Sequence, residues 1–279
     1  MKKRELVWMG IPALLWFLCF LLGPLLQVFY LSFKRRGTYG GVEDVVQLAN
    51  YSRSLQPVYS QVLLESLLLA FVTALLCVLI AVPLAWGLTS LSESRKKAAL
   101  TLLAVPFFMN LIARVYALKS FLHTEGPLVR ILDFFGWTGD PTSLAQNYPL
   151  VLYGLVVTYL PFLLLPVWVQ LEKTDPAFME AALDLGETPW GAFRKVILPQ
   201  LRPALASGLL LVIVPVLGEY VIPDLLGGAK TMLAGNLISE QFLKARDWPF
   251  GATLATELIV ILGCMSFALL YWGKRGAEK

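Results

Sequence analysis

Long apolar runs without charge constrain this chain more than any other feature of its sequence. Residues 7–33, 66–92 and 141–171 contain no charged side chain. A helix that crosses the hydrocarbon core of a bilayer needs about 20 predominantly apolar residues, so each run is long enough to cross. Only 15% of the residues are charged, whereas a soluble domain has about 25%. We therefore expect an integral membrane protein.

Three further apolar runs each contain a single ionisable residue, which is Arg114, Glu219 or Glu257. Runs of this length are typical of spanning helices and do not fit barrel strands, which alternate over about ten residues. The sequence also shows no internal repeat. It therefore predicts an all-α integral membrane protein with one transmembrane domain over residues 1–279. The six predicted transmembrane helices cover residues 7–33, 64–91, 98–118, 149–171, 203–222 and 249–273.

Basic residues orient these predicted spans. If both termini are cytoplasmic, the cytoplasmic side collects the basic clusters at residues 2–4, 95–97 and 194–195. Cytoplasmic loops of membrane proteins are enriched in Lys and Arg, so we expect both termini on that side. No cluster of metal ligands and no paired nucleophile and base is visible, so we expect neither a metal site nor a catalytic residue.

The segment 173–202 falls on the cytoplasmic side and has the signals of two short helices. Its predicted starts and stops are Asp175-Pro176, Gly186, Thr188-Pro189 and Pro199, in keeping with the preferences for N-caps, first-turn prolines and left-handed glycines. Its first helix has one apolar face, formed by Phe178, Ala181, Ala182 and Leu185. Such a face can fill a groove on a soluble partner. An ordinary packed connector is the alternative, and these patterns alone do not decide between the two.

A known motif runs through the same segment. Glu180-Ala181-Ala182, Gly186, Val196 and Leu198-Pro199 resemble, in register, the EAA loop of ATP-binding-cassette (ABC) importer permeases, which usually have isoleucine in place of Val196. The resemblance implies a type I ABC importer permease fold, with a coupling loop over 173–202 that docks into an ATPase subunit. The coupling residues that it implies are Glu180, Ala181, Ala182, Gly186, Leu198 and Pro199.

The ATPase is expected on a separate chain. A phosphate-binding loop needs the pattern G-x-x-x-x-G-K-[ST]. The nearest stretch, Gly227 to Thr231, has Ala229 at the second glycine and Asp224 at the first. We therefore expect this transport subunit to be no enzyme and to bind no cofactor, with ATP and Mg²⁺ held by the partner.

Ionisable residues within spans are expensive and mark transport pathways. At about 1.5 Å per residue, Arg114, Glu219, Glu257 and Glu65 all fall in the outer half of the bilayer or at its rim. Carboxylates beside aromatic rings suit a cation, which gains Coulomb and cation–π attraction. The predicted substrate pathway consists of Glu65, Tyr116, Tyr159, Glu219, Tyr220, Asp224, Trp248 and Glu257. In the alternative interpretation, Arg114 neutralises one carboxylate and the aromatic rings form interface belts.

A second resemblance concerns the substrate. Residues 218–228 and Arg246-Asp247-Trp248-Pro249, together with Leu84-Ala85-Trp86 and Arg114-Val115-Tyr116-Ala117, are similar to stretches of spermidine/putrescine importer permeases, and the likeness covers nearly the whole chain. It implies a multi-pass subunit of the bacterial inner membrane that imports polyamines. The implied partners are two copies of a cytoplasmic ATPase, a second homologous permease, a periplasmic polyamine-binding protein and membrane lipid. Nucleic acid is not expected as a partner.

Two other classes of function stay open. A permease of the same family could carry another solute, although an anion would favour Lys or Arg along the pathway. An ion-coupled secondary transporter often has internal repeats and helices broken at the midplane, and this chain shows no repeat. A membrane enzyme fits less well, because no catalytic pair or metal cluster is visible.

Overall fold

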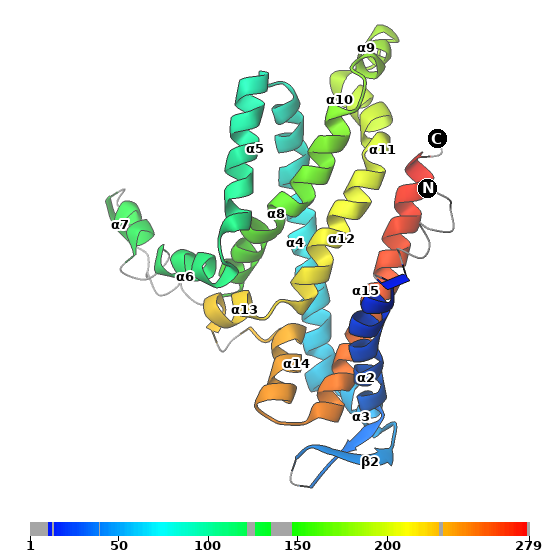
Figure 1. The fold of residues 1–279 in the computed structure, drawn as a ribbon. Helices are drawn as coiled ribbons and strands as arrows, with labels where there is room; N and C mark the ends of the chain where they lie inside the picture. Colours follow the sequence, from blue (N-terminus) through cyan, green and yellow to red (C-terminus); the bar gives the residue numbers. More distant parts are fainter. Residues whose placement is uncertain are drawn as a thin grey trace. The chain divides into compact units, whose positions relative to one another are not determined.

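The computed structural model is mostly helical and describes residues 11–12, 14–38, 40–121, 126–134, 147–228 and 231–277. The chain divides into two compact units, shown in one ribbon in Figure 1. Unit 1 comprises Met1–Gln61 and Leu237–Ile261, and unit 2 comprises Val62–Asn236 and Leu262–Lys279. Each unit is described below by itself.

Four helices of the described residues are long and apolar enough to cross a membrane. They are Leu14–Ser32, which contains the π-turn η1 (Leu18–Leu22) and α2 (Gly23–Ser32), then α4 (Pro57–Thr89), α8 (Tyr148–Glu172) and Trp248–Lys274, the main part of α15 (Trp248–Ala277). The segments Pro189–Gln200 and Arg202–Gly218, bent by 68° at Leu201, form a fifth span if they count as one. These helices confirm a mostly helical membrane protein, while six spans and cytoplasmic termini stay predictions.

The predicted continuous helix over 98–118 is wrong. The structure has α5 (Glu93–Phe108) and α6 (Leu111–Phe121), separated by Met109 and Asn110. The side-chain oxygen of Asn110 accepts hydrogen bonds from the backbone N–H groups of Ile112 (2.8 Å) and Ala113 (3.4 Å). Asparagine is a favoured N-cap because its side chain satisfies the first free N–H groups of a helix. Asn110 therefore begins a new helix inside an apolar run.

Unit 2 is built around α8 and α12 (Arg202–Gly218), which run side by side in Figure 1. Gly208 of α12 lies directly against Leu163 of α8, where an added Cβ would come within 2.5 Å of Leu163 Cδ1 and 3.2 Å of its Cα. Small residues let helices approach closely in a membrane, where van der Waals packing favours association. Leu155, Leu163 and Val167 of α8 are fully buried. The tight α8–α12 pair is thus the core of unit 2.

The remaining elements are short. Strands β1 (Lys34–Arg36) and β2 (Val42–Val46) pair antiparallel in unit 1. The short helices are α3 (Ala49–Ser54), α7 (Pro127–Phe134), α9 (Ala177–Asp184), α10 (Pro189–Ala192), the π-turn η3 (Phe193–Ile197), α11 (Leu198–Gln200), α13 (Val221–Leu226) and α14 (Ala234–Leu243).

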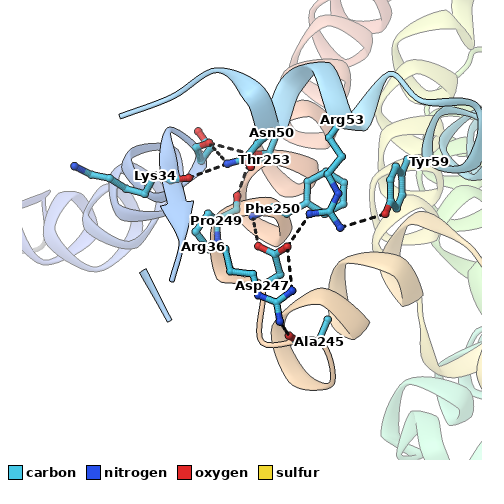
Figure 2. Close-up of polar contacts among 11 residues, drawn as sticks. Lys34, Arg36, Asn50, Arg53, Tyr59, Ala245, Asp247, Pro249, Phe250 and Thr253 are labelled. Atoms are coloured by element: carbon cyan, nitrogen blue, oxygen red, sulfur yellow. Dashed lines mark hydrogen bonds and ion pairs between the residues drawn. The ribbon is translucent and has the colours of Figure 1, made fainter. Parts of the chain in front are cut away.

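A buried carboxylate organises unit 1. The side chain of Asp247, which is 2% exposed, accepts a hydrogen bond of 2.7 Å from Arg53 Nη1 and lies 3.8 Å from Arg36 Nη1. Figure 2 shows these two guanidinium groups, one from α3 and one from β1, converging on Asp247. Arg36 also donates to the carbonyl oxygen of Ala245 (2.8 Å). One carboxylate therefore joins α3 and β1 to the turn that leads into α15.

Aromatic rings and backbone contacts complete this network. The Arg53 guanidinium lies 3.9 Å from the centre of the Phe250 ring and donates to the hydroxyl of Tyr59 (3.2 Å). Asn50 donates to the carbonyl oxygens of Ser32 (3.1 Å) and Lys34 (2.9 Å), so the end of α2 is also satisfied. The Arg246-Asp247-Trp248-Pro249 stretch thus contains the central residue of a structural network.

Replacement of Asp247 by Ala is expected to destabilise the protein, because Arg53 loses its counterion inside a polar network. Breaking a fully buried pair costs about 3–5 kcal/mol, and the partial exposure of Arg53 reduces this to roughly 2 kcal/mol. Thermal unfolding of purified protein in detergent measures the change as a lower midpoint temperature. Glu240→Ala is the matched control, since it breaks the exposed pair with Lys244 and costs about 0.5 kcal/mol or less. Equal midpoints for the two variants would contradict the central role of Asp247.

Candidate functional site

Most of the helix start and stop signals of the segment 173–202 are visible in the structure. Asp175 Oδ1 accepts a hydrogen bond from the N–H of Ala177 (2.9 Å), at the start of α9. Gly186 adopts φ +85°, and Thr188 Oγ1 accepts from the N–H of Gly191 (3.1 Å) at the start of α10. The left-handed glycine and the N-cap at Thr188 are therefore confirmed, whereas Pro176 rather than Asp175 holds the N-cap position of α9.

The prediction that Pro199 ends the second helix is wrong. The helix continues through η3 and α11 to Gln200, and the N–H of Leu198 donates to Phe193 O, five residues back. Proline has no N–H to donate, and the wider π-turn immediately before it changes the hydrogen-bond register. The direction of the chain changes at Leu201 instead, where the next helix begins at 68°.

The apolar face of α9 is mostly uncovered by the rest of the chain. Phe178 is 54% exposed and Leu185 is 86% exposed, while Ala182 is buried and Ala181 is exposed. Trp190 of α10 is 71% exposed. Leu198 and Pro199 are half-buried, and the exposed Glu180 lines a pocket of about 400 Å³. Large apolar side chains on two short helices outside the long helices form a surface suited to a partner.

One contact joins this segment to the end of α4, and a second contact beside it joins the start of α5 to the end of α8. The Trp86 ring of α4 meets the Phe193 ring edge to face, with centres 5.3 Å apart and planes at 82°. Lys96 Nζ of α5 donates to Glu172 Oε1 at the end of α8 (2.7 Å), and this carboxylate raises the pKa of Lys96. The sequence analysis predicted neither of these two contacts, although Trp86 lies in one of the stretches that carry the resemblance.

A second candidate site forms where α12 ends. The sequence predicts a span to 222 that is interrupted around Glu219, since Pro215 and Gly218 flank this residue and Pro223-Asp224 follows it. The structure has this interruption, because α12 ends at Gly218 and α13 begins at Val221. Glu219 is buried between them. Its Oε1 accepts from the N–H groups of Val221 (2.9 Å) and Ile222 (3.4 Å), and its Oε2 accepts from the Tyr159 hydroxyl (2.6 Å). Glu219 thus caps α13 and is anchored to α8.

Further backbone contacts hold this break in place. Gly235 packs so closely that an added Cβ would lie 2.7 Å from the carbonyl oxygen of Gly218 and 2.8 Å from that of Glu219. Asn236 Nδ2 donates to the carbonyl oxygen of Tyr220 (2.9 Å). The N–H of Ala234 donates to Ser66 Oγ of α4 (2.8 Å). Sequence patterns act over a few residues and do not reveal contacts between distant parts of the chain. Sequence reasoning therefore did not identify these residues as part of the site.

The structure brings together only some residues of the predicted pathway. Glu219 and Tyr159 are in direct contact, whereas Tyr220 and Asp224 follow the break with exposed side chains. Arg114 donates to Met109 O (3.3 Å) and interacts electrostatically with Tyr159.

The other pathway residues have contacts within their own units. Glu65 and Tyr116 of unit 2 are exposed, and Glu65 interacts electrostatically with Tyr148. Glu257 and Trp248 belong to unit 1, where Glu257 Oε1 accepts from Ser54 Oγ (2.5 Å) and Trp248 opens α15. Within the described ranges, no group of three or more His, Cys, Asp and Glu side chains could hold a metal ion.

Comparison with known proteins gives consistent matches over most of the chain. Residues 78–272 match the family described as "Binding-protein-dependent transport system inner membrane component". The spermidine/putrescine transport system permease protein PotB of Salmonella typhimurium (strain SL1344) is 40% identical, over 92% of this chain and 89% of that protein. PotB of Escherichia coli (strain K12) is 39% identical, over 92% and 93%.

A solved structure has the same fold. It is a bacterial alginate ABC transporter in complex with an alginate pentasaccharide-bound periplasmic protein. A chain of that structure superposes with a TM-score of 0.80 at 16% identity, over 98% of this chain and 95% of that chain.

Gly186→Ala is expected to loosen the turn between α9 and α10. A left-handed conformation costs a residue with a Cβ about 1–2 kcal/mol, which corresponds to roughly tenfold faster hydrogen exchange. The reporters are the N–H groups of Gly186 and Glu187, which donate to the carbonyl oxygens of Leu183 and Ala182. Gly87→Ala is the control, because no heavy atom lies within 4 Å of an added Cβ and its φ is ordinary. Unchanged exchange in Gly186→Ala would contradict the role of this glycine.

Proposed function

This chain belongs to the family of binding-protein-dependent transport system inner membrane components. We propose that it is the permease subunit of an ABC importer that carries polyamines, such as spermidine and putrescine, into the cytoplasm. The observation that carries the proposal is 40% identity to a spermidine/putrescine permease over 92% of the chain. The family places the chain in the inner membrane, and its long apolar helices agree with that location.

The proposed coupling element is the pair of helices α9 and α10. Their exposed apolar residues Phe178, Leu185 and Trp190 would fill a groove on a separate ATPase subunit, which would hold ATP and Mg²⁺. Glu180 lies on α9 and lines the pocket of about 400 Å³. The complete importer would contain two ATPase copies, a second homologous permease and a periplasmic polyamine-binding protein. Six spans with both termini in the cytoplasm belong to the same proposal.

In this mechanism, ATP binding closes the two ATPase subunits and draws the coupling helices together. The spans then open outward, and the binding protein releases the polyamine into the opening. ATP hydrolysis returns the pathway to the inward-facing state. A pathway must attract its substrate strongly enough to load it and weakly enough to release it, which favours a few separated carboxylates.

The pathway proposal assigns different roles to the residues near the break. Glu219 is held by three hydrogen bonds, so it supplies negative charge at a fixed position. Tyr220 and Asp224 have exposed side chains and would contact the ammonium groups directly. Glu257 would be a further carboxylate for the ammonium groups. An anionic substrate is less suitable, because Arg114 is the sole basic residue of the six predicted spans.

Charge reversal at Glu180 is expected to abolish uptake of labelled spermidine and putrescine by cells that contain all subunits. Glu180→Lys places a cation at the pocket that Glu180 lines beside the coupling helices. Asp184→Lys is the matched control, since Asp184 is exposed on the same helix and does not line the pocket. Normal uptake by Glu180→Lys would contradict the coupling assignment, and an intact system that moves no polyamine would contradict the substrate.

Neutral substitutions at the two carboxylates test the pathway. Glu219→Gln keeps an oxygen acceptor for Val221 and Ile222 but removes the charge, and Glu257→Gln does the same beside Ser54. Each is expected to lower uptake at limiting polyamine concentration about tenfold, because one carboxylate–ammonium attraction contributes about 1–4 kcal/mol in water or near a protein surface. Glu240→Gln, which changes a carboxylate paired with Lys244, is the control. Full uptake by both Glu219→Gln and Glu257→Gln would remove these residues from the pathway.

A further inference from the structure

Two pockets separate the end of α4 from the coupling segment. One, of about 710 Å³, lies between Val78, Leu79 and Val82 of α4 and Pro189 and Leu198 of the coupling segment, among other lining residues. The other is the pocket of about 400 Å³ that Glu180 lines. Trp86 and Met179 line both pockets. The coupling segment is therefore loosely packed against α4, with the Trp86 indole between two spaces.

Three aromatic rings connect the exposed surface to α4. Trp190, which is 71% exposed, stacks on Phe193 with ring centres 5.6 Å apart. Phe193 in turn meets Trp86 at 5.3 Å. Phe193 is also the first residue of the π-turn η3, and π-turns are frequent at functional sites. The rings thus form a continuous path from the face that would meet the ATPase to the end of a spanning helix.

The end of α4 has a place to bend. Pro83 lies inside the helix, and it cannot donate the hydrogen bond that would otherwise hold the preceding turn. Sharp helix kinks occur mostly at such prolines. The residues between Pro83 and the end of α4 at Thr89, with Trp86 among them, form a short segment that can change direction relative to the rest of the helix.

We propose that the Trp86–Phe193 ring contact transmits movement of the coupling helices to the end of α4, which bends at Pro83. This inference rests on the proposed function of the segment as the coupling element. The flanking pockets give the coupling segment room to move, and the ring contact carries that movement across the gap. Trp86 is thus a positioning residue for transport, without contact to substrate or nucleotide.

The coupling ratio, which is the number of polyamine molecules moved per ATP hydrolysed, tests this role in the complete importer, reconstituted in lipid vesicles. Trp86→Ala and Phe193→Ala are each expected to lower the number of polyamine molecules moved per ATP hydrolysed about tenfold, a typical size for loss of coupling between sites. The ATPase subunits stay bound in both variants. The double variant is expected to be no worse than either single variant, because residues in contact act non-additively. The exchange variant Trp86→Phe with Phe193→Trp restores an aromatic pair and most of the ratio.

Lys96→Ala is the matched control. It removes the contact between α5 and α8 at the same level of the protein, and it leaves the ring contact in place. It is expected to keep the coupling ratio of the unmodified importer. A normal ratio in Trp86→Ala would overturn the inference, as would loss of transport that is matched by loss of bound ATPase.

A spin label at Leu84→Cys provides a readout that does not depend on the substrate. Leu84 is 47% exposed and lies between Pro83 and Trp86, and Cys19→Ser and Cys264→Ser remove the two exposed cysteines. The mobility of the label is expected to change when ATP is trapped on the unmodified complex, and this change is lost in Trp86→Ala. An importer that moves no polyamine but shows this change contradicts the proposed substrate and supports the inference. A change that persists in Trp86→Ala overturns the inference.

Discussion

The need to satisfy backbone hydrogen bonds in an apolar environment governs this structure. A bilayer core offers no water to a free N–H or C=O group, so each interruption of a helix requires an internal partner. The chain has such interruptions at Asn110 and Glu219, and in both cases the side chain at the break accepts from the first N–H groups of the next helix. Irregular backbone therefore occurs where a polar side chain compensates for it.

Glu219 shows how this requirement and function meet in one residue. Its carboxylate caps α13 and binds Tyr159, so the break cannot form in this way without a buried acceptor. The same group brings negative charge into an apolar segment, which is costly. In the proposed pathway, the residues that follow the break, Tyr220 and Asp224, contact the substrate, while Glu219 fixes the geometry that presents them.

Unit 2 combines two kinds of packing. The α8–α12 pair is tight, because Gly208 admits Leu163 against its backbone. The coupling segment borders two pockets and meets α4 through aromatic rings. A tight core keeps the spanning helices in register, whereas loose packing allows the coupling segment to move. The difference in packing thus matches the division between a scaffold and a moving part.

Local sequence determined much of this protein. Apolar runs specify the long helices, because exposure of such runs to water is unfavourable. The signals at Asp175, Gly186 and Thr188 specify the helices of the coupling segment, because those signals act within a few residues. Tertiary structure decided what local signals do not specify, such as the close approach of Gly208 in α12 to Leu163 in α8 and the continuation of the coupling helix through Pro199 to Gln200. It also decided the pairs Tyr159–Glu219, Arg53–Asp247 and Trp86–Phe193. Their partners are distant in the chain, so their contacts depend on how whole helices pack, and no local pattern records that.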